Sequence, residues 1–167
     1  LKEIDTLVFD IQDIGCRFYT YVATMLESMK AAAAAGKNFI VLDRINPING
    51  TTIDGPLPVG EPTFVACHPI PLRHGMTAGE LARLFASELK LKLSLTIIPV
   101  EGWDRTRDHA ATGLPWVNPS PNMRSLDAAT VYPGVALMEF CNLSVGRGTD
   151  TPFRLVGAPW IDGPALA

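Results

Sequence analysis

A strand–helix–strand pattern within the first 42 residues is the feature that most constrains the fold. Residues 6–11 and 39–42 are short apolar runs rich in β-forming side chains, and each predicts a buried strand. Residues 18–35 lie between them, with apolar side chains at helical spacing, and Gly36 follows where a helix C-terminal cap belongs. Two strands joined through a helix form a βαβ unit, which requires a parallel pair. We therefore expect a three-layer α/β domain with a mainly parallel sheet.

The middle of the chain extends this pattern. Residues 45–73 are rich in proline and glycine without clear period, and a loop of this length is usually functional or a lid. Thr77 and Glu80 form a capping-box pattern that starts a second helix. Residues 95–100 predict a third strand, and Pro99 favours a strand end or a sheet edge.

The last third of the chain is less regular. Residues 102–125 have no clear period, and residues 126–141 predict a helix that is broken or restarted at residues 132–134, where a proline stands. Residues 155–161 favour a final strand or extended segment. Because 167 residues are enough for one compact α/β domain, we expect one domain over residues 1–167, cut from a longer protein at both ends.

Composition excludes several classes of protein. Hydrophobic residues make up 47% of the 167 residues and charged residues 19%, which is not typical of a disordered chain. The formal net charge of −3 gives no electrostatic reason to expect nucleic acid or an anionic membrane as partner. No apolar run approaches the roughly 20 residues that span a bilayer. Cys16, Cys67 and Cys141 are far apart, which excludes a Cys-x-x-Cys metal site and favours buried thiols. We expect no metal and no cofactor.

Polar residues follow both strands of the βαβ unit. Asp10 and Asp13 flank the end of the first strand, and Asp43 and Arg44 end the second. Ligands of parallel sheets bind outside the carboxyl ends of the strands, so these residues are candidates for a polar cleft. Two close carboxylates can divide acid and base roles between them. The structural alternatives are that Asp13 caps a turn, that Asp10 bonds the backbone, and that Asp43 and Arg44 form an ion pair that only orders the loop.

Two further positions carry candidate chemistry. His74 stands just before the capped helix, where it could bond a substrate hydroxyl or carboxylate, although a lone histidine is equally often structural. Glu139 lies among apolar residues, and burial there would raise its pKa as a general acid requires. Arg147 could bind a carboxylate with both nitrogens. Alternatively, Glu139 and Arg147 form a salt bridge that fixes the loop between them.

Aromatic residues complete the set of candidates. Trp103, Trp116 and Trp160 sit beside glycine or proline, where an indole face could stack on a sugar ring, although each is more often part of a core. From the residues alone, the sequence therefore predicts an α/β domain whose polar cleft suits a carbohydrate or a small anionic ligand.

An ordered set of motifs makes the interpretation more specific. The motifs are Phe9-Asp10-Ile11-Gln12-Asp13-Ile14-Gly15, Arg17-Phe18-Tyr19-Thr20-Tyr21, Leu42-Asp43-Arg44, His74-Gly75-Met76-Thr77-Ala78-Gly79-Glu80-Leu81, Pro119-Ser120-Pro121-Asn122-Met123, Tyr132-Pro133-Gly134, Asn142-Leu143-Ser144-Val145-Gly146-Arg147-Gly148-Thr149 and Gly157-Ala158-Pro159-Trp160. In this order they resemble the bacterial exo-β-N-acetylmuramidase family, and the resemblance covers nearly the whole chain.

The resemblance implies a fold and an activity. Family members look like two-domain, usually exported glycosidases that remove N-acetylmuramic acid from the non-reducing end of peptidoglycan fragments. This chain would form most of their Rossmann-like N-terminal domain, and the C-terminal domain would lie outside it. A Pro-Glu-His-Gly motif of the family, whose glutamate is a leading catalytic candidate, would precede the first strand and so also lie outside. The sequence does not indicate an oligomeric state.

The resemblance also suggests roles for individual residues. Glycoside hydrolysis usually requires two carboxyl groups. One would come from the upstream motif, and Glu139 is the first choice for the other, followed by Asp10 and Asp13. Arg44, His74 and Arg147 are candidates to hold the lactyl carboxylate of muramic acid, and Tyr21, Asn122 and Asn142 are candidates for the hydroxyls or acetamido group. The remaining candidates for substrate binding are Arg17, Asp43 and Asn46.

Two other classes of protein remain open. A non-catalytic module that binds muramyl sugars or peptidoglycan would carry the same motifs without the upstream glutamate. A dinucleotide-binding domain is disfavoured, because the loop after the first strand contains only Gly15 instead of a glycine-rich fingerprint, and Gly146 and Gly148 do not follow a strand.

Overall fold

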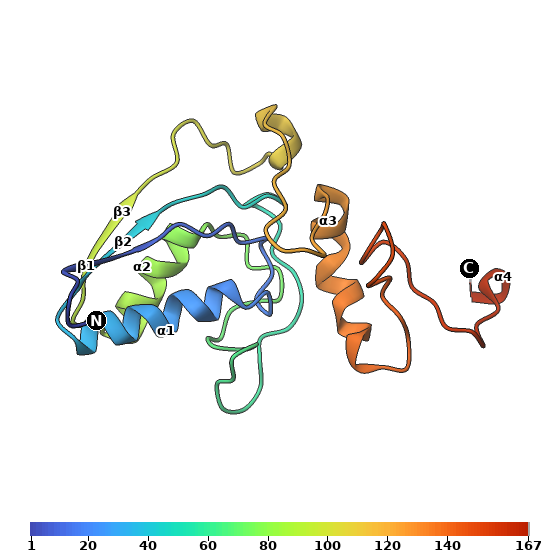
Figure 1. The fold of residues 1–167 in the computed structure, drawn as a ribbon, viewed down its shortest axis with the longest axis horizontal. Helices are drawn as coiled ribbons and strands as arrows, with labels where there is room; N and C mark the ends of the chain where they lie inside the picture. Colours follow the sequence, from blue (N-terminus) through green and yellow to red (C-terminus); the bar gives the residue numbers. More distant parts are fainter. Residues whose placement is uncertain (167) are drawn as a thin grey trace. The chain divides into compact units, whose positions relative to one another are not determined.

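The computed structural model describes residues 1–166, which cluster into two compact units where we expected one domain. The first unit is Leu1–Thr112 and the second begins at Gly113 (Figure 1). The elements of the first unit are β1 Thr6–Phe9, α1 Tyr21–Ala34, β2 Asn38–Leu42, α2 Ala78–Glu88, β3 Ser94–Ile98 and the 3₁₀ helix η1 His109–Thr112. Those of the second unit are α3 Leu126–Val135, the 3₁₀ helix η2 Ala136–Phe140 and α4 Gly163–Leu166.

The three strands form a parallel sheet in the order β1-β2-β3. The register places Leu7 opposite Phe39 and Phe39 opposite Leu95, so these three apolar residues form a row on the same face of the sheet. The α/β class and the parallel βαβ unit predicted from the sequence are confirmed. The edge position of β3 agrees with Pro99, which follows its last residue.

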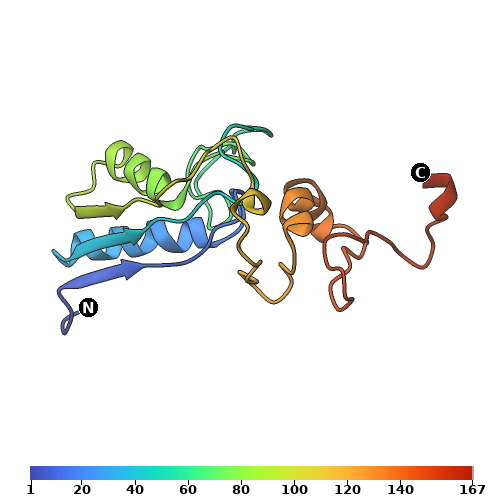
Figure 2. The ribbon, with the colours of Figure 1, turned by 90° about the horizontal axis from the view of Figure 1, so that it is seen from above.

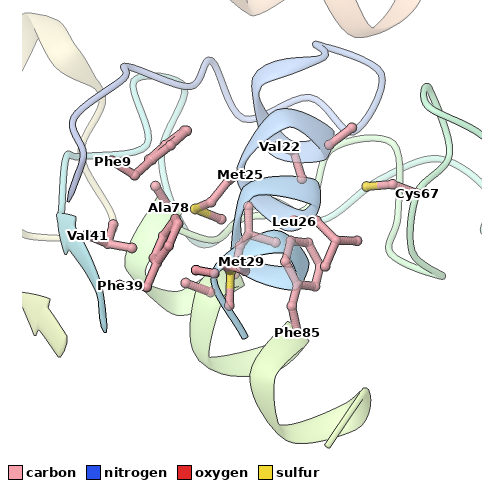
Figure 3. Packing of buried hydrophobic residues seen from close by; sticks show 14 of the residues in the cluster. Phe9, Val22, Met25, Leu26, Met29, Phe39, Val41, Cys67, Ala78 and Phe85 are labelled. Carbon is pink, nitrogen blue, oxygen red and sulfur yellow. The ribbon is translucent and has the colours of Figure 1, made fainter. Parts of the chain in front are cut away.

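One face of the sheet packs against both α1 and α2. Phe9, Phe39 and Val41 point from the strands into a buried cluster with Met29 of α1 and Phe85 of α2 (Figure 3). Fully burying each such side chain contributes roughly 1.5–3 kcal/mol, so this layer contact is the main source of stability in the unit. Figure 2 shows the two helices beside the sheet on this same side.

The opposite face of the sheet is open in the described residues. Val8 is 52% exposed, Leu42 37% and Ile98 49%, and the three side chains alternate along their strands with less exposed positions. Residues 1–112 therefore form two layers, a sheet and a helix pair, instead of the three layers that we expected. The strands predicted as buried are accordingly covered on one side.

The ends of the helices follow from local sequence. After α1, the N–H of Gly36 donates to Ala33 and that of Lys37 to Ala32, the bonds of a Schellman motif, and Gly36 has a φ of +64°. The cap predicted at Gly36 is thereby confirmed. At α2, the Thr77 side chain accepts from Glu80 N–H while the Glu80 carboxylate accepts from Thr77 N–H, which confirms the capping box.

The second unit differs more from expectation. Helix α3 runs through Pro133 to Val135 and then tightens into η2, so the change of helix type comes after the predicted break at residues 132–134. Residues 155–161 form no strand; Gly157 makes a single antiparallel bridge with Ser144, through hydrogen bonds of 2.8 and 2.9 Å. Within the described residues, no helix has the length and apolar character needed to cross a membrane.

Candidate functional site

An exposed ion pair joins the carboxyl ends of β1 and β2. The Arg44 guanidinium donates to one oxygen of Asp10, with Nη2 at 2.6 Å and Nε at 2.8 Å. The side chains are 43% and 48% exposed, respectively, so the contact is a surface pair of small net stability. Because neighbouring parallel strands end at the same edge, the sheet brings these two candidates together. Each keeps one face open to solvent, which leaves the guanidinium accessible to a ligand carboxylate.

The Asp43 carboxylate accepts hydrogen bonds from residues at the start of α2. The donors are Gly79 N–H at 2.7 Å and the Thr77 hydroxyl at 2.8 Å. Negative charge is favourable at a helix N-terminus, where backbone N–H groups are unpaired. A Cβ on Gly79 would lie 2.7 Å from Asp43 Cγ, so only glycine permits this approach. Asp43 therefore joins β2 to α2 instead of pairing with Arg44, and its position does not favour the predicted role in substrate binding.

Asp13 and His74 are brought together in the interior. The His74 side chain is fully buried and its Nε2 lies 3.3 Å from Asp13 Oδ2. Asp13 Oδ2 also accepts the N–H of Gly15 at 2.7 Å, in the local turn foreseen as the structural alternative. His74 accepts the N–H of Met76 at Nδ1, at 3.1 Å. Both side chains are buried, so neither lies at the surface, where we expected Asp13 as a catalytic carboxylate and His74 as a substrate ligand.

Asn46 and Gln12 extend this buried network. Asn46 is 2% exposed; its amide donates to Met76 O at 3.1 Å and its oxygen accepts Ile48 N–H at 3.2 Å. The Gln12 amide donates to the carbonyl of Ile45 at 3.0 Å, across 33 positions of sequence. Asn46 therefore holds the backbone and is not placed as a direct ligand of a sugar. Nothing in the local pattern singles out Gln12, because its partner depends on the register of the two strands.

Arg17 organises the long loop over residues 45–73. Its guanidinium Nη1 donates to the carbonyls of Pro56 at 2.9 Å and Ile70 at 2.6 Å, which closes the neck of the loop. Arg17 is 7% exposed, and burial lowers the pKa of its guanidinium. The structure thus favours a role in loop architecture over the predicted substrate contact.

Arg105, which the sequence analysis did not single out, joins two of the residues that it did, Glu80 and Trp103. Arg105 donates to both carboxylate oxygens of Glu80, at 2.7 and 2.8 Å, so Glu80 combines its cap with an ion pair. The Arg105 guanidinium also lies over the Trp103 ring, 5.5 Å from its centroid. The indole is half-buried against Gly50, where a Cβ would come within 2.8 Å of it. The irregular sequence of residues 102–125 carries no periodic signal of this arrangement.

The second unit contains the pair of Glu139 and Arg147. Arg147 Nε donates to Glu139 Oε1 at 2.5 Å, and its guanidinium stacks over Phe153 at 4.9 Å from the ring centroid. The Glu139 side chain is 22% exposed, while the apolar neighbours Leu137 and Phe140 are 55% and 96% exposed. The apolar enclosure foreseen for Glu139 is therefore not formed in this unit. The salt bridge named as the alternative is present.

The other candidates lie in less confined positions. Tyr21 begins α1 and packs its ring edge-to-face on Tyr19, with centroids 4.9 Å apart. Asn122 is half-buried in a turn, and Asn142 is exposed after η2. Of the other tryptophans expected in a core, Trp116 is half-buried, with its indole N–H donating to Met123 O at 3.0 Å, and Trp160 is 64% exposed.

A shallow hollow of about 450 Å³ lies beside α3 in the second unit. It is lined by Asp127, Thr130, Val131, Val135, Phe153, Arg154 and Val156. None of the residues predicted for the site contributes to this lining, so the hollow is not part of the candidate site.

The first unit is thus an α/β fold with a parallel sheet. At the carboxyl ends of its strands, hydrogen bonds between polar side chains and backbone hold the loops together. Residues 1–127 match the family model described as exo-β-N-acetylmuramidase NamZ, N-terminal. The chain belongs to this NamZ family. Residues 130–167 match the model of the family's C-terminal domain, so part of that domain is present, although we expected it to lie outside the chain.

Individual relatives agree with this assignment. The chain is 50% identical over 167 residues to the peptidoglycan β-N-acetylmuramidase NamZ of Bacillus subtilis (strain 168), covering 99% of this chain and 40% of that protein. Two solved structures of DUF1343 family proteins from Bacteroides fragilis NCTC 9343 are also similar. One has a TM-score of 0.93 at 43% identity, covering 100% of this chain and 44% of its own. The other has a TM-score of 0.86 at 37% identity, covering 97% and 46%. The chain spans less than half the length of each relative.

Proposed function

We propose that the protein containing this chain is an exo-β-N-acetylmuramidase. It would hydrolyse the glycosidic bond that follows a non-reducing-end N-acetylmuramic acid in peptidoglycan fragments. The 50% identity to the Bacillus subtilis peptidoglycan β-N-acetylmuramidase, over nearly the whole chain, is the observation that carries the proposal. Since peptidoglycan lies outside the cytoplasm, we also propose that the protein is exported.

The carboxylates of this chain can supply part of the chemistry. Glycoside hydrolysis uses one carboxyl group to protonate the leaving oxygen and another as base or nucleophile. Asp10 and Glu139 are the sequence candidates that keep solvent-accessible carboxylates, and each is held by an arginine. We propose that the acid comes from elsewhere in the full-length protein.

Arg44 is the proposed ligand of the lactyl carboxylate. The Arg44 side chain is 43% exposed, and its guanidinium donates to one oxygen of Asp10. It can therefore also donate hydrogen bonds to the carboxylate of a ligand. His74 is no longer proposed for this contact, because its side chain is fully buried. Arg147 is half-exposed and remains a second candidate, although Glu139 and Phe153 already hold its guanidinium.

The test is product release by the full-length protein. Wild type incubated with N-acetylmuramyl-β-1,4-N-acetylglucosamine should release free N-acetylmuramic acid, detected by mass spectrometry. If Asp10 or Glu139 is catalytic, Asp10→Asn or Glu139→Gln should lower kcat by about 100-fold or more with the fold retained. A folded wild-type protein that binds the disaccharide without cleaving it would instead be a binding module.

A further inference from the structure

We propose that Asp13 and His74 form a positioning pair that sets the geometry of Asp10 and Arg44 without touching the substrate. The inference rests on the proposed hydrolase function and assigns these two residues a role different from catalysis or direct binding. It starts from their burial: the Asp13 side chain is 10% exposed and that of His74 is 0% exposed.

The tautomer of His74 follows from its contact with Met76. Met76 N–H donates to Nδ1 at 3.1 Å, so Nδ1 must present a lone pair. The ring proton then resides on Nε2, which lies 3.3 Å from Asp13 Oδ2, a close polar contact that falls outside hydrogen-bond geometry. The same oxygen accepts Gly15 N–H at 2.7 Å. Asp13 Oδ2 therefore accepts a hydrogen bond from Gly15 N–H and also lies against the His74 ring, which comes from a different loop.

The pair links the loops that carry the exposed residues. Asp10 and Asp13 belong to the loop that leaves β1, and His74 belongs to the segment that enters α2. The loop after β2, which carries Arg44, is tied to that segment by Asn46, whose amide donates to Met76 O at 3.1 Å. Met76 therefore bonds His74 through its N–H and Asn46 through its carbonyl.

Close packing at the centre of these loops leaves little slack. Gly15 has a φ of +82°, and a Cβ there would lie 2.4 Å from Asn46 Oδ1. The loops after β1 and β2 are thus in direct contact beneath the network. A shift of Asp13 is transmitted to Asn46 and hence to Arg44, two residues earlier in the chain. In this role Asp13 supplies an acceptor oxygen at the Oδ2 position and transfers no proton.

Two substitutions of Asp13 in the full-length protein separate the roles. Asparagine keeps an oxygen that accepts Gly15 N–H and faces His74 Nε2 but removes the carboxyl group, whereas alanine removes both. We expect Asp13→Asn to keep kcat and KM for the muramyl disaccharide within about threefold of wild type. We expect Asp13→Ala to raise KM by about tenfold or more, because Arg44 is displaced, with a smaller effect on kcat. Asp5→Asn, at an exposed position away from the network, is the control for loss of charge.

A loss of kcat of about 100-fold or more in a folded Asp13→Asn protein, with KM unchanged, would overturn the proposal and make Asp13 a catalytic carboxyl. A second measurement does not depend on enzymatic activity. It tests the pair even when Asp13→Ala does not fold or when the wild type is not a hydrolase. Histidine-selective ¹⁵N NMR of wild type, assigned with His74→Gln, should show a pyridine-like shift for Nδ1 and a pyrrole-like shift for Nε2. The reverse assignment would contradict the pair, whereas absence of hydrolysis with the expected tautomer would contradict only the proposed function.

Discussion

At the scale of single residues, partners depend on positions distant in sequence. The sequence predicts that Asp10, Asp43 and Arg44 share one edge, because this follows from strand order alone. It does not predict that Arg44 reaches across 34 positions to Asp10 while Asp43 turns to the start of α2. His74 shows the same limit: its burial depends on the path of residues 45–73, which carry no periodic pattern.

Burial also governs the cysteines, and Cys16 offers a pH test. Burial raises the pKa of the Cys16 thiol to about 12 from 9.0, so the folded state keeps a proton that the unfolded chain loses. The stability that this retained proton contributes is fully present below pH 9.0 and is lost as pH rises toward 12. The free energy of unfolding should thus fall by about 2 kcal/mol between pH 9 and 10.5 through this group.

Urea unfolding of the full-length protein at several pH values measures this effect. Cys16→Ala should lose most of that slope, because no thiol then ionises on unfolding, while the exposed Cys141 replaced in the same way should leave it unchanged. Equal slopes in wild type and Cys16→Ala would contradict the burial of this thiol.

At the scale of elements, short-range signals are the ones the sequence carries well. The capping box at Thr77 and the Schellman motif at Gly36 are both read from residues within one turn, and both are confirmed. Helix α3 is harder, because a proline lowers helix stability without fixing where the helix ends. There Pro133 is accommodated, and the helix changes to 3₁₀ geometry only at Ala136.

Two glycines in helices should respond in opposite ways to alanine. Gly79→Ala in α2 places a Cβ 2.6 Å from Ile97 Cγ2, so overpacking should cost about 1–3 kcal/mol of stability despite the better helix propensity. Gly134→Ala in α3 meets no atom within 4 Å and should gain up to about 1 kcal/mol. Urea midpoints of the full-length variants measure both effects. A stabilised Gly79→Ala protein would show that α2 does not approach β2 and β3 this closely.

At the scale of the molecule, the βαβ pattern predicts the parallel sheet and the helix layer that covers it. It does not predict which face stays open, because apolar runs such as residues 39–42 look the same whether one or both faces are covered. The exposed Val8, Leu42 and Ile98 show that the helices of residues 1–112 cover one face. The sequence alone does not predict the division near residue 113, because the proline-rich residues 113–122 are equally compatible with a long loop inside one domain.

The function can be tested most directly by a pair of substrates that differ in the lactyl group. Full-length protein should hydrolyse N-acetylmuramyl-β-1,4-N-acetylglucosamine with a kcat/KM at least about 100-fold above that for N,N′-diacetylchitobiose, because only the muramyl substrate carries the lactyl carboxylate that we assign to Arg44. Arg44→Gln should lower kcat/KM for the muramyl disaccharide and leave that for N,N′-diacetylchitobiose unchanged, so the ratio of the two values should fall. Equal kcat/KM values for the two disaccharides, or cleavage of neither by the folded protein, would contradict the assignment of a muramic-acid-specific hydrolase.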